Sequence, residues 1–153
     1  MKKAAVLALI LLEICCLLLT GCEQKNADPV WNAEELWQRM LQTEGMPEMV
    51  TVPADKCEYI FGVMEEDCAQ ELLSICQNSM LADEIWLVEA KDSETADKIE
   101  KLASARIGQK ADELRDYAPD QYQVVQKAKL IRRGTQVVLI ISPLSEELAA
   151  MVK

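Results

Sequence analysis

Apolar residues recur every three or four positions between Asp92 and about Asp116. They are Ile99, Ala103, Ile107, Ala111 and Leu114, a spacing that places them on one buried face of an α-helix. Either Asp92 or Ser93 is suited to cap this helix. We expect the helix to run to about Asp116 and to close before Pro119, because the residue before a proline disfavours helical geometry.

Three continuous or alternating apolar runs predict strands. Ile85–Ala90 carries Ile-Trp-Leu-Val between polar flanks, which is typical of a strand buried on both faces. Lys129–Arg132 and Gln136–Ile141 flank Arg133-Gly134-Thr135, and a glycine at the bend indicates a hairpin. The second arm is apolar from Val137 onwards, so we expect it in the centre of the sheet.

The pattern is ambiguous in the middle of the chain. In Glu71–Gln77 and just before it, Cys68, Leu72 and Cys76 fit a helical spacing of four, whereas Leu73 and Ile75 alternate as in a strand. Both interpretations remain open on periodicity alone. Met49–Val52 is predicted as a brief extended piece, and Lys56–Gly62 as one or two helical turns.

Shorter helices are predicted at both ends of the folded part and before the hairpin. Asn32 is suited to cap the first, with Glu35 placed to reach back to it; Gly45 and Pro47 mark its end. Gln121–Gln126 is predicted as a short helix. The last helix is expected to begin at Ser142-Pro143 and to run to about Val152.

The elements follow the order helix, strand, strand, long helix, strand, strand, helix. This order predicts an α+β fold. Its core is strand-strand-helix-strand-strand, an antiparallel sheet of about four strands packed with a long helix and with N- and C-terminal helices.

The N-terminal segment has the organisation of an export signal. An apolar run follows Lys2-Lys3 and ends in Leu19-Thr20-Gly21-Cys22. This order resembles the lipobox of bacterial lipoproteins, in which the cysteine thiol takes a diacylglycerol and the preceding peptide is removed. The resemblance implies lipid attachment at Cys22 and no other cofactor. An uncleaved membrane anchor is the alternative, although the run contains Glu13 and is shorter than the roughly 20 residues that span a bilayer.

These features divide the chain into three parts. Residues 1–21 are interpreted as the signal peptide, residues 22–30 as a polar tether, and residues 31–153 as a single α+β domain. A diacylglyceryl group provides the two hydrocarbon chains that stable anchoring needs. We therefore expect a protein bound to the membrane through its lipid, on the extracytoplasmic face of the cell membrane.

Composition narrows the range of partners. Removal of Lys2, Lys3 and Glu13 with the signal changes the formal net charge from −10 to −11. An acidic domain disfavours nucleic acid as a partner, since nucleic acid rewards clustered Lys and Arg. It also disfavours lying flat on anionic lipid. The oligomeric state is left open.

Three cysteines remain besides Cys22. Cys57, Cys68 and Cys76 cannot all pair within one chain. One alternative is a Cys68–Cys76 disulfide with one free thiol, which an extracytoplasmic location permits. The other is three buried thiols that act as small hydrophobic side chains, and the sequence leaves the redox state open.

The sequence contains few of the residue types and motifs that commonly form catalytic or metal-binding sites. The chain has no histidine, which removes the commonest general base and the commonest metal ligand. Three cysteines spaced eleven and eight apart lack the spacing of a zinc site. The acidic run Glu65-Glu66-Asp67 and the pairs Glu34-Glu35 and Glu146-Glu147 are interpreted as helix N-terminal charge and solvated surface. We predict no catalytic and no metal-binding residue, and no enzyme.

A family resemblance rests on several segments together. Ala82–Asp92, the long helix, Tyr117–Tyr122 and Gly134 resemble a family of small, mostly Gram-positive bacterial lipoproteins known only as a domain of unknown function. The resemblance covers roughly Val30 to Val152 and favours the strand interpretation of Glu71–Gln77. It implies no activity and no site residues.

The leading hypothesis is therefore a lipid-anchored, extracytoplasmic binding or interaction module with a protein partner in the cell envelope. It rests on a strongly specified anchor and the lack of a catalytic pattern. A small-molecule or cation-binding lipoprotein is one alternative, and a histidine-free enzyme built on carboxylates is another.

Overall fold

The computed structural model describes residues 30–152, so the predicted signal peptide, Cys22 and the tether up to residue 29 lie outside the described residues. Its centre is a five-stranded antiparallel sheet with the strand order β1-β2-β3-β5-β4. The strands are β1 (Met49–Val52), β2 (Cys68–Cys76), β3 (Glu84–Ala90), β4 (Lys129–Arg133) and β5 (Gln136–Ile141).

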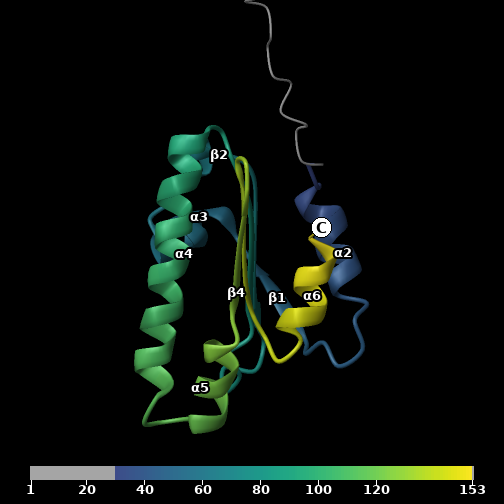
Figure 1. The fold of residues 1–153 in the computed structure, drawn as a ribbon, viewed down its shortest axis with the longest axis vertical. Coiled ribbons are helices and arrows are strands. Elements are labelled where there is room, and N and C mark those ends of the chain that lie inside the picture. The colour runs from purple at the N-terminus through teal and green to yellow at the C-terminus, as the bar shows by residue number, and fades with distance from the viewer. Residues whose placement is uncertain (1–29, 153) are drawn as a thin grey trace, which may run out of the picture.

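Helices cover both faces of this sheet and make three layers (Figure 1). One face carries α3 (Ala54–Phe61), the long α4 (Ser93–Leu114) and α5 (Pro119–Gln126). The other carries α2 (Ala33–Met40) and α6 (Ser145–Met151). A short 3-10 helix, η1 (Glu65–Asp67), leads into β2.

The two central strands supply both cores because each is apolar on its two faces. Trp86 and Val88 of β3 pack toward α3 and α4, whereas Ile85 and Leu87 pack toward α2 and α6. Every residue of β5 is buried. A strand covered on both faces needs a continuous apolar run, which is what the sequence has here.

Most predicted elements are confirmed, and the fold is α+β as expected. The brief extended piece at Met49–Val52 is a fifth strand at the sheet edge, and the ambiguous Glu71–Gln77 segment belongs to strand β2. The long helix ends at Leu114. Its cap is Asp92, whose Oδ1 accepts a hydrogen bond from the Thr95 amide at 2.7 Å.

Both terminal helices differ from their predicted bounds. The first ends at Met40, before the predicted stop at Gly45 and Pro47. The last begins at Ser145 rather than at Ser142-Pro143. The Ser142 hydroxyl donates to buried Asp83 at 2.8 Å and accepts from the Leu144 amide at 3.2 Å. Ser142 therefore forms a turn before the helix and is tied to a residue distant in the sequence.

Of the two alternatives for the cysteines, the Cys68–Cys76 disulfide is wrong. These residues stand at opposite ends of β2, and eight steps of about 3.3 Å place their Cα atoms roughly 26 Å apart. A disulfide needs Cα atoms within about 7 Å. All three thiols are free; Cys57 and Cys76 are buried and Cys68 is half-buried.

Candidate functional site

The start of the described chain is fixed to one end of the sheet. The Ala33 amide donates to Gln70 Oε1 at 2.8 Å, and Gln136 Nε2 donates to the Trp31 carbonyl at 3.1 Å. Gln70 also donates to Glu89 at 2.6 Å. At this end of the sheet, β2 begins and β3 ends. The chain therefore enters the domain beside the start of β2, next to η1.

Helix α3 is short, and a residue with non-helical backbone geometry flanks it at each end. Pro53 precedes it in extended geometry, and Gly62 ends it with a positive φ of 70°. Only Cys57 and Phe61 of α3 are buried. The Phe61 ring stacks on Trp86 of β3 with centroids 3.8 Å apart, so one aromatic contact is part of what holds α3 to the sheet.

The outward side of this region exposes large apolar side chains. Tyr59 is 90% exposed, Met64 49% and Ile60 37%. Glu58, Met64, Glu65 and Glu66 line a shallow open hollow of about 580 Å³. We define the α3 surface as the exposed side chains of α3, η1 and the loop between them, namely Asp55, Lys56, Glu58, Tyr59, Ile60, Met64, Glu65, Glu66 and Asp67.

The acidic groups of the α3 surface are poorly neutralised. Among residues 30–152, the ion pair that involves this surface joins Lys56 to Asp55 at 3.8 Å, and both side chains are exposed. Such a pair contributes little. Glu58, Glu65 and Glu66 form no ion pair within the described chain. The surface is therefore both apolar and negatively charged.

A half-buried carboxylate, that of Glu71, lies on the same face of the sheet. Glu71 Oε1 accepts a hydrogen bond from Trp86 Nε1 at 2.8 Å, while its Oε2 is buried without a hydrogen-bond partner in the described structure. Burial raises the pKa of Glu71, the Trp86 hydrogen bond lowers it in part, and the charge of Glu65 raises it further. The carboxyl thus favours its protonated form more than an exposed glutamate does.

Two thiols of this region are held in their unreactive form. Burial, followed by the charge of Glu71, raises the pKa of Cys57 to about 11 and that of Cys68 to about 12. Because the thiolate is the nucleophile and the metal ligand, neither thiol is prepared for chemistry at neutral pH. Within residues 30–152, no three cysteines or acids come close enough together to hold a metal ion.

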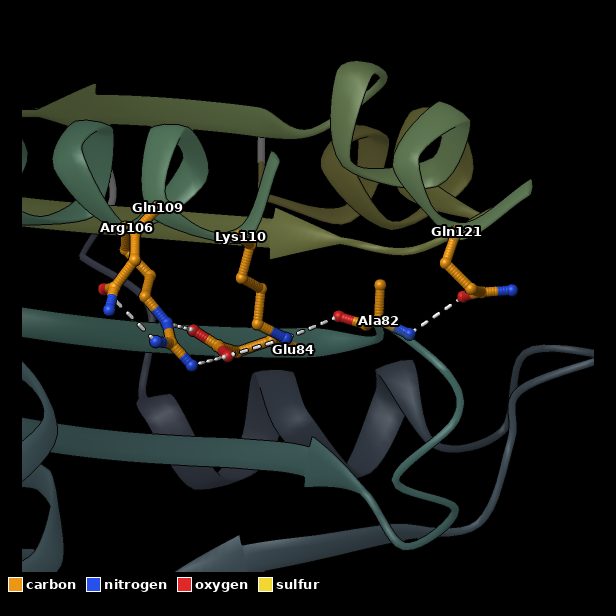
Figure 2. Close-up of polar contacts among 6 residues, drawn as sticks. All are labelled: Ala82, Glu84, Arg106, Gln109, Lys110 and Gln121. Carbon is orange, nitrogen blue, oxygen red and sulfur yellow. Dashed lines mark hydrogen bonds and ion pairs between the residues drawn. The ribbon is translucent and has the colours of Figure 1, made fainter. Parts of the chain in front are cut away.

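A second carboxylate, which is fully buried, has the opposite surroundings (Figure 2). Glu84, 1% exposed at the start of β3, accepts from Arg106 Nε at 3.0 Å and from Arg106 Nη2 at 2.9 Å. Lys110 Nζ lies 3.0 Å from Glu84 Oε2 and donates to the Ala82 carbonyl at 2.9 Å. The Ala82 amide donates to Gln121 of α5.

This network ties two helices to the strand. Burial alone would raise the pKa of Glu84, but the hydrogen bonds and charges of Arg106 and Lys110 outweigh it and hold the pKa below its ordinary value. Arg106 and Lys110 are one helical turn apart on α4, so both reach one carboxylate. We assign the network a structural role, because its charged groups bond to one another and to the backbone rather than pointing to a ligand.

The sequence did not predict these features. The acidic run Glu65–Asp67 was interpreted as helix-terminal charge and solvated surface; it forms η1, and two of its members line the hollow. Tyr59 and Met64 carried no signal, since exposure depends on which residues α3 buries. For the buried network, a charged residue at the head of the Ile85–Ala90 run was the available signal. Cys22, the predicted lipid site, lies outside the described residues.

Comparison with known proteins identifies a family but no function. A family model described as "Domain of unknown function (DUF4358)" matches residues 43–142, a range that includes α3, η1, the sheet, α4 and α5. No curated protein and no solved structure matches the chain. Among residues 30–152, no helix is long and apolar enough to cross a membrane.

Proposed function

The chain belongs to the DUF4358 family, and we propose that it is a lipid-anchored, extracytoplasmic binding module that recognises a protein partner in the cell envelope. The observation that carries the binding role is the α3 surface. Exposed apolar patches often mark interaction sites; here Met64 lines the hollow, and Tyr59 and Ile60 of the same surface are also exposed.

The anchoring part of the proposal rests on the sequence. Leu19-Thr20-Gly21-Cys22 follows an apolar run with a basic start, as in lipoprotein signals. A diacylglyceryl thioether on Cys22 would hold the protein at the membrane. Eight residues, Glu23–Val30, separate this cysteine from Trp31 and give a reach of about 15 Å as a coil. The partner would accordingly be met close to the membrane.

A cation-binding role is the second candidate: acids line the hollow, but within residues 30–152 no three of them stand close enough together to hold a metal ion, so this role would require them to move together on binding. Carboxylate oxygens are the ligands that Ca²⁺ prefers, and Glu58, Glu65 and Glu66 border one space. This candidate predicts that Ca²⁺ binds at micromolar to millimolar concentration and that charge-neutral variants of these acids lose binding. Isothermal titration with Ca²⁺ alone tests it.

Metabolic labelling with radioactive palmitate tests the anchor. We expect label on the wild-type protein and none on Cys22→Ala, because the acceptor thiol is gone. Cys16→Ala is the matched control, since that cysteine would leave with the signal, and its product should keep the label. Label that persists in Cys22→Ala would overturn the anchoring proposal. Fractionation alone is insufficient, because an uncleaved signal also retains the protein in membranes.

Site-specific photo-crosslinking on intact cells tests the binding role. A photoreactive residue is placed at Tyr59 on the α3 surface, at Gln38 on α2, or at Tyr117 after α4, all exposed positions. A binding module should give one discrete adduct of near-equal stoichiometry from at least one position. Diffuse adducts with abundant neighbours from all three positions would contradict the proposal.

A further inference from the structure

Charge is distributed unevenly between the two sides of the sheet. Four cations, Lys127, Lys129, Arg132 and Arg133, lie in or beside β4 at one edge. Five acids and one lysine lie on the α3 surface near the β1–β2 side. The domain therefore presents a negative surface and a positive edge at different places.

The two charged regions differ in how far the chain neutralises them. At the β4 edge, Lys129 pairs with Glu146, and Arg132 pairs with Asp97 at 3.1 Å. On the α3 surface, the described residues supply one long, exposed pair. Charge that the fold leaves uncompensated around exposed apolar groups is available to complement an incoming surface.

The apolar groups indicate what kind of ligand fits. Tyr59 lies opposite the buried Cys57 and Phe61 on α3, so its ring stands clear of the domain. Tyrosine and methionine are enriched in protein interfaces, where they supply contact area without charge. A metal ion or a small polyamine would use the carboxylates but would leave these side chains exposed. A protein segment uses both.

We propose that the α3 surface binds a positively charged segment of a protein partner, in which Lys or Arg side chains face Glu58, Glu65 and Glu66 while an apolar side chain packs between Tyr59 and Met64. This proposal rests on the binding function proposed above and specifies its surface and partner chemistry. Complementary charge steers such a segment to the surface and selects against acidic ones.

Other occupants fit the surface less well. An anionic membrane would be repelled by the uncompensated acids. A second copy of this chain would have to bring the β4 edge to the α3 surface, and two of the four cations at that edge, Lys129 and Arg132, are already paired within the chain. A head-to-tail contact of that kind also does not close into a symmetric dimer.

The test compares charge reversals at matched exposed positions in the full-length protein, purified in a non-ionic detergent. The α3-surface variant is Glu58→Lys with Glu65→Lys, and the control is Glu44→Lys with Glu147→Lys, which gives the same net charge from exposed sites elsewhere. The probe is a short fluorescent peptide of repeated Lys and Leu, with a Glu-Leu peptide as its counterpart. Binding is followed by fluorescence anisotropy at about physiological ionic strength.

We expect the Lys-Leu peptide to bind the wild-type protein and the control within about threefold of each other, and the α3-surface variant at least about tenfold more weakly, since tenfold corresponds to only about 1.4 kcal/mol. Tyr59→Ala should weaken binding without altering net charge. Equal weakening in the two reversed proteins would overturn the proposal, because it would show a response to net charge alone. Binding of the Glu-Leu peptide, or displacement of the Lys-Leu peptide by micromolar Ca²⁺, would also overturn it.

Crosslinking in cells separates this inference from the function on which it rests. A discrete adduct from Tyr59 that disappears in Glu58→Lys/Glu65→Lys and persists in the control supports both. A discrete adduct from Gln38 or Tyr117 alone keeps the binding function and overturns the α3 surface as its site. Light scattering that detects a dimer broken by the α3-surface reversals would identify a second copy as the occupant and overturn the basic partner.

Discussion

Two glutamates on the same face of the sheet, Glu84 fully buried and Glu71 half-buried, have opposite surroundings. Glu84 receives two hydrogen bonds from Arg106 and the charge of Lys110, whereas Glu71 receives one hydrogen bond from Trp86 and keeps one oxygen without a partner in the described structure. The pKa of Glu84 is lowered and that of Glu71 is raised. Burial acts on both, so the difference comes from the partners.

The contrast divides the face into two regions with different roles. In the region around α4, Arg106 and Lys110 both pair with Glu84 and hold the helix to the sheet. This arrangement indicates a structural function. The α3 region leaves a carboxyl oxygen without a partner, leaves surface acids unpaired and exposes Tyr59. The partly buried carboxylate without full compensation costs stability, whereas the unpaired surface acids are exposed to solvent and free to meet a partner.

The largest expected effect comes from breaking the compensated region. Glu84→Gln removes the charge that Arg106 and Lys110 share and leaves two largely buried cations, 20% and 14% exposed, without an anion. Removal of one partner from a buried ion pair typically costs about 3–5 kcal/mol. Urea unfolding should show a loss of this size.

Glu94→Gln is the matched control for this change. Glu94 lies 3.9 Å from Lys98 on the exposed face of α4, and such surface pairs contribute up to about 1 kcal/mol. A Glu84→Gln protein as stable as the Glu94→Gln protein would show that the buried network does not hold α4 to the sheet. The structural role assigned to that network would then be wrong.

Phe61→Ala addresses the attachment of α3. The ring stacks on Trp86 and is 6% exposed, so we expect a loss of about 3 kcal/mol from the missing contacts and the cavity left behind. Tyr59→Ala in the same helix should change stability by less than about 0.5 kcal/mol, because its side chain is 90% exposed. A large loss from Tyr59→Ala would mean that the α3 surface is covered within the protein, against both proposals.

A pair of glycine substitutions compares the two helices directly. Gly62 ends α3 at a φ of +70°, whereas Gly108 lies inside α4; a Cβ at either position meets nothing within 4 Å. Gly62→Ala should therefore destabilise by about 1 kcal/mol through backbone strain alone, and Gly108→Ala should stabilise by about 0.5–1 kcal/mol. Thermal unfolding measures both, and a neutral Gly62→Ala would contradict the assigned end of α3.

Most of the fold could be predicted from the sequence, because a strand that is buried on both faces has a continuous run of apolar residues. Ile85–Ala90 and Val137–Ile141 could hardly form anything but central strands, and the spacing from Ile99 to Leu114 specified the long helix. Elements that depend on distant contacts were placed less well. The last helix begins after its predicted start at Ser142, which bonds to Asp83, a residue 59 positions away.

The candidate site was largely beyond the sequence for the same reason. Glu84 and Glu71 look alike in the chain, and their difference arises from side chains that the fold brings from α4 and β3. The exposure of Tyr59 follows from which side of α3 meets Trp86. The Cys68–Cys76 disulfide, one of the two alternatives that the sequence leaves open, is excluded by the extended geometry of β2.

The smallest expected effect sharpens the comparison through pH. A carboxyl whose pKa is raised in the folded protein binds its proton more tightly there than in the unfolded chain. Stability therefore falls as pH rises from the ordinary glutamate value through the raised one.

Glu71→Gln cannot ionise and escapes this fall, and its amide oxygen can still accept from Trp86. Relative to the wild type, the variant should gain stability as pH rises from about 4 to 7. Urea unfolding of both proteins across this range measures the difference, in which the other carboxylates cancel. For Glu84→Gln the difference from the wild type should change in the opposite direction, because the wild type gains stability as its Glu84 ionises. If the stability of the wild type and of Glu71→Gln changed with pH in the same way, the pKa of Glu71 would not be raised in the folded protein. Glu71 and Glu84 would then differ in their hydrogen-bond partners but not in the way predicted for their pKa values.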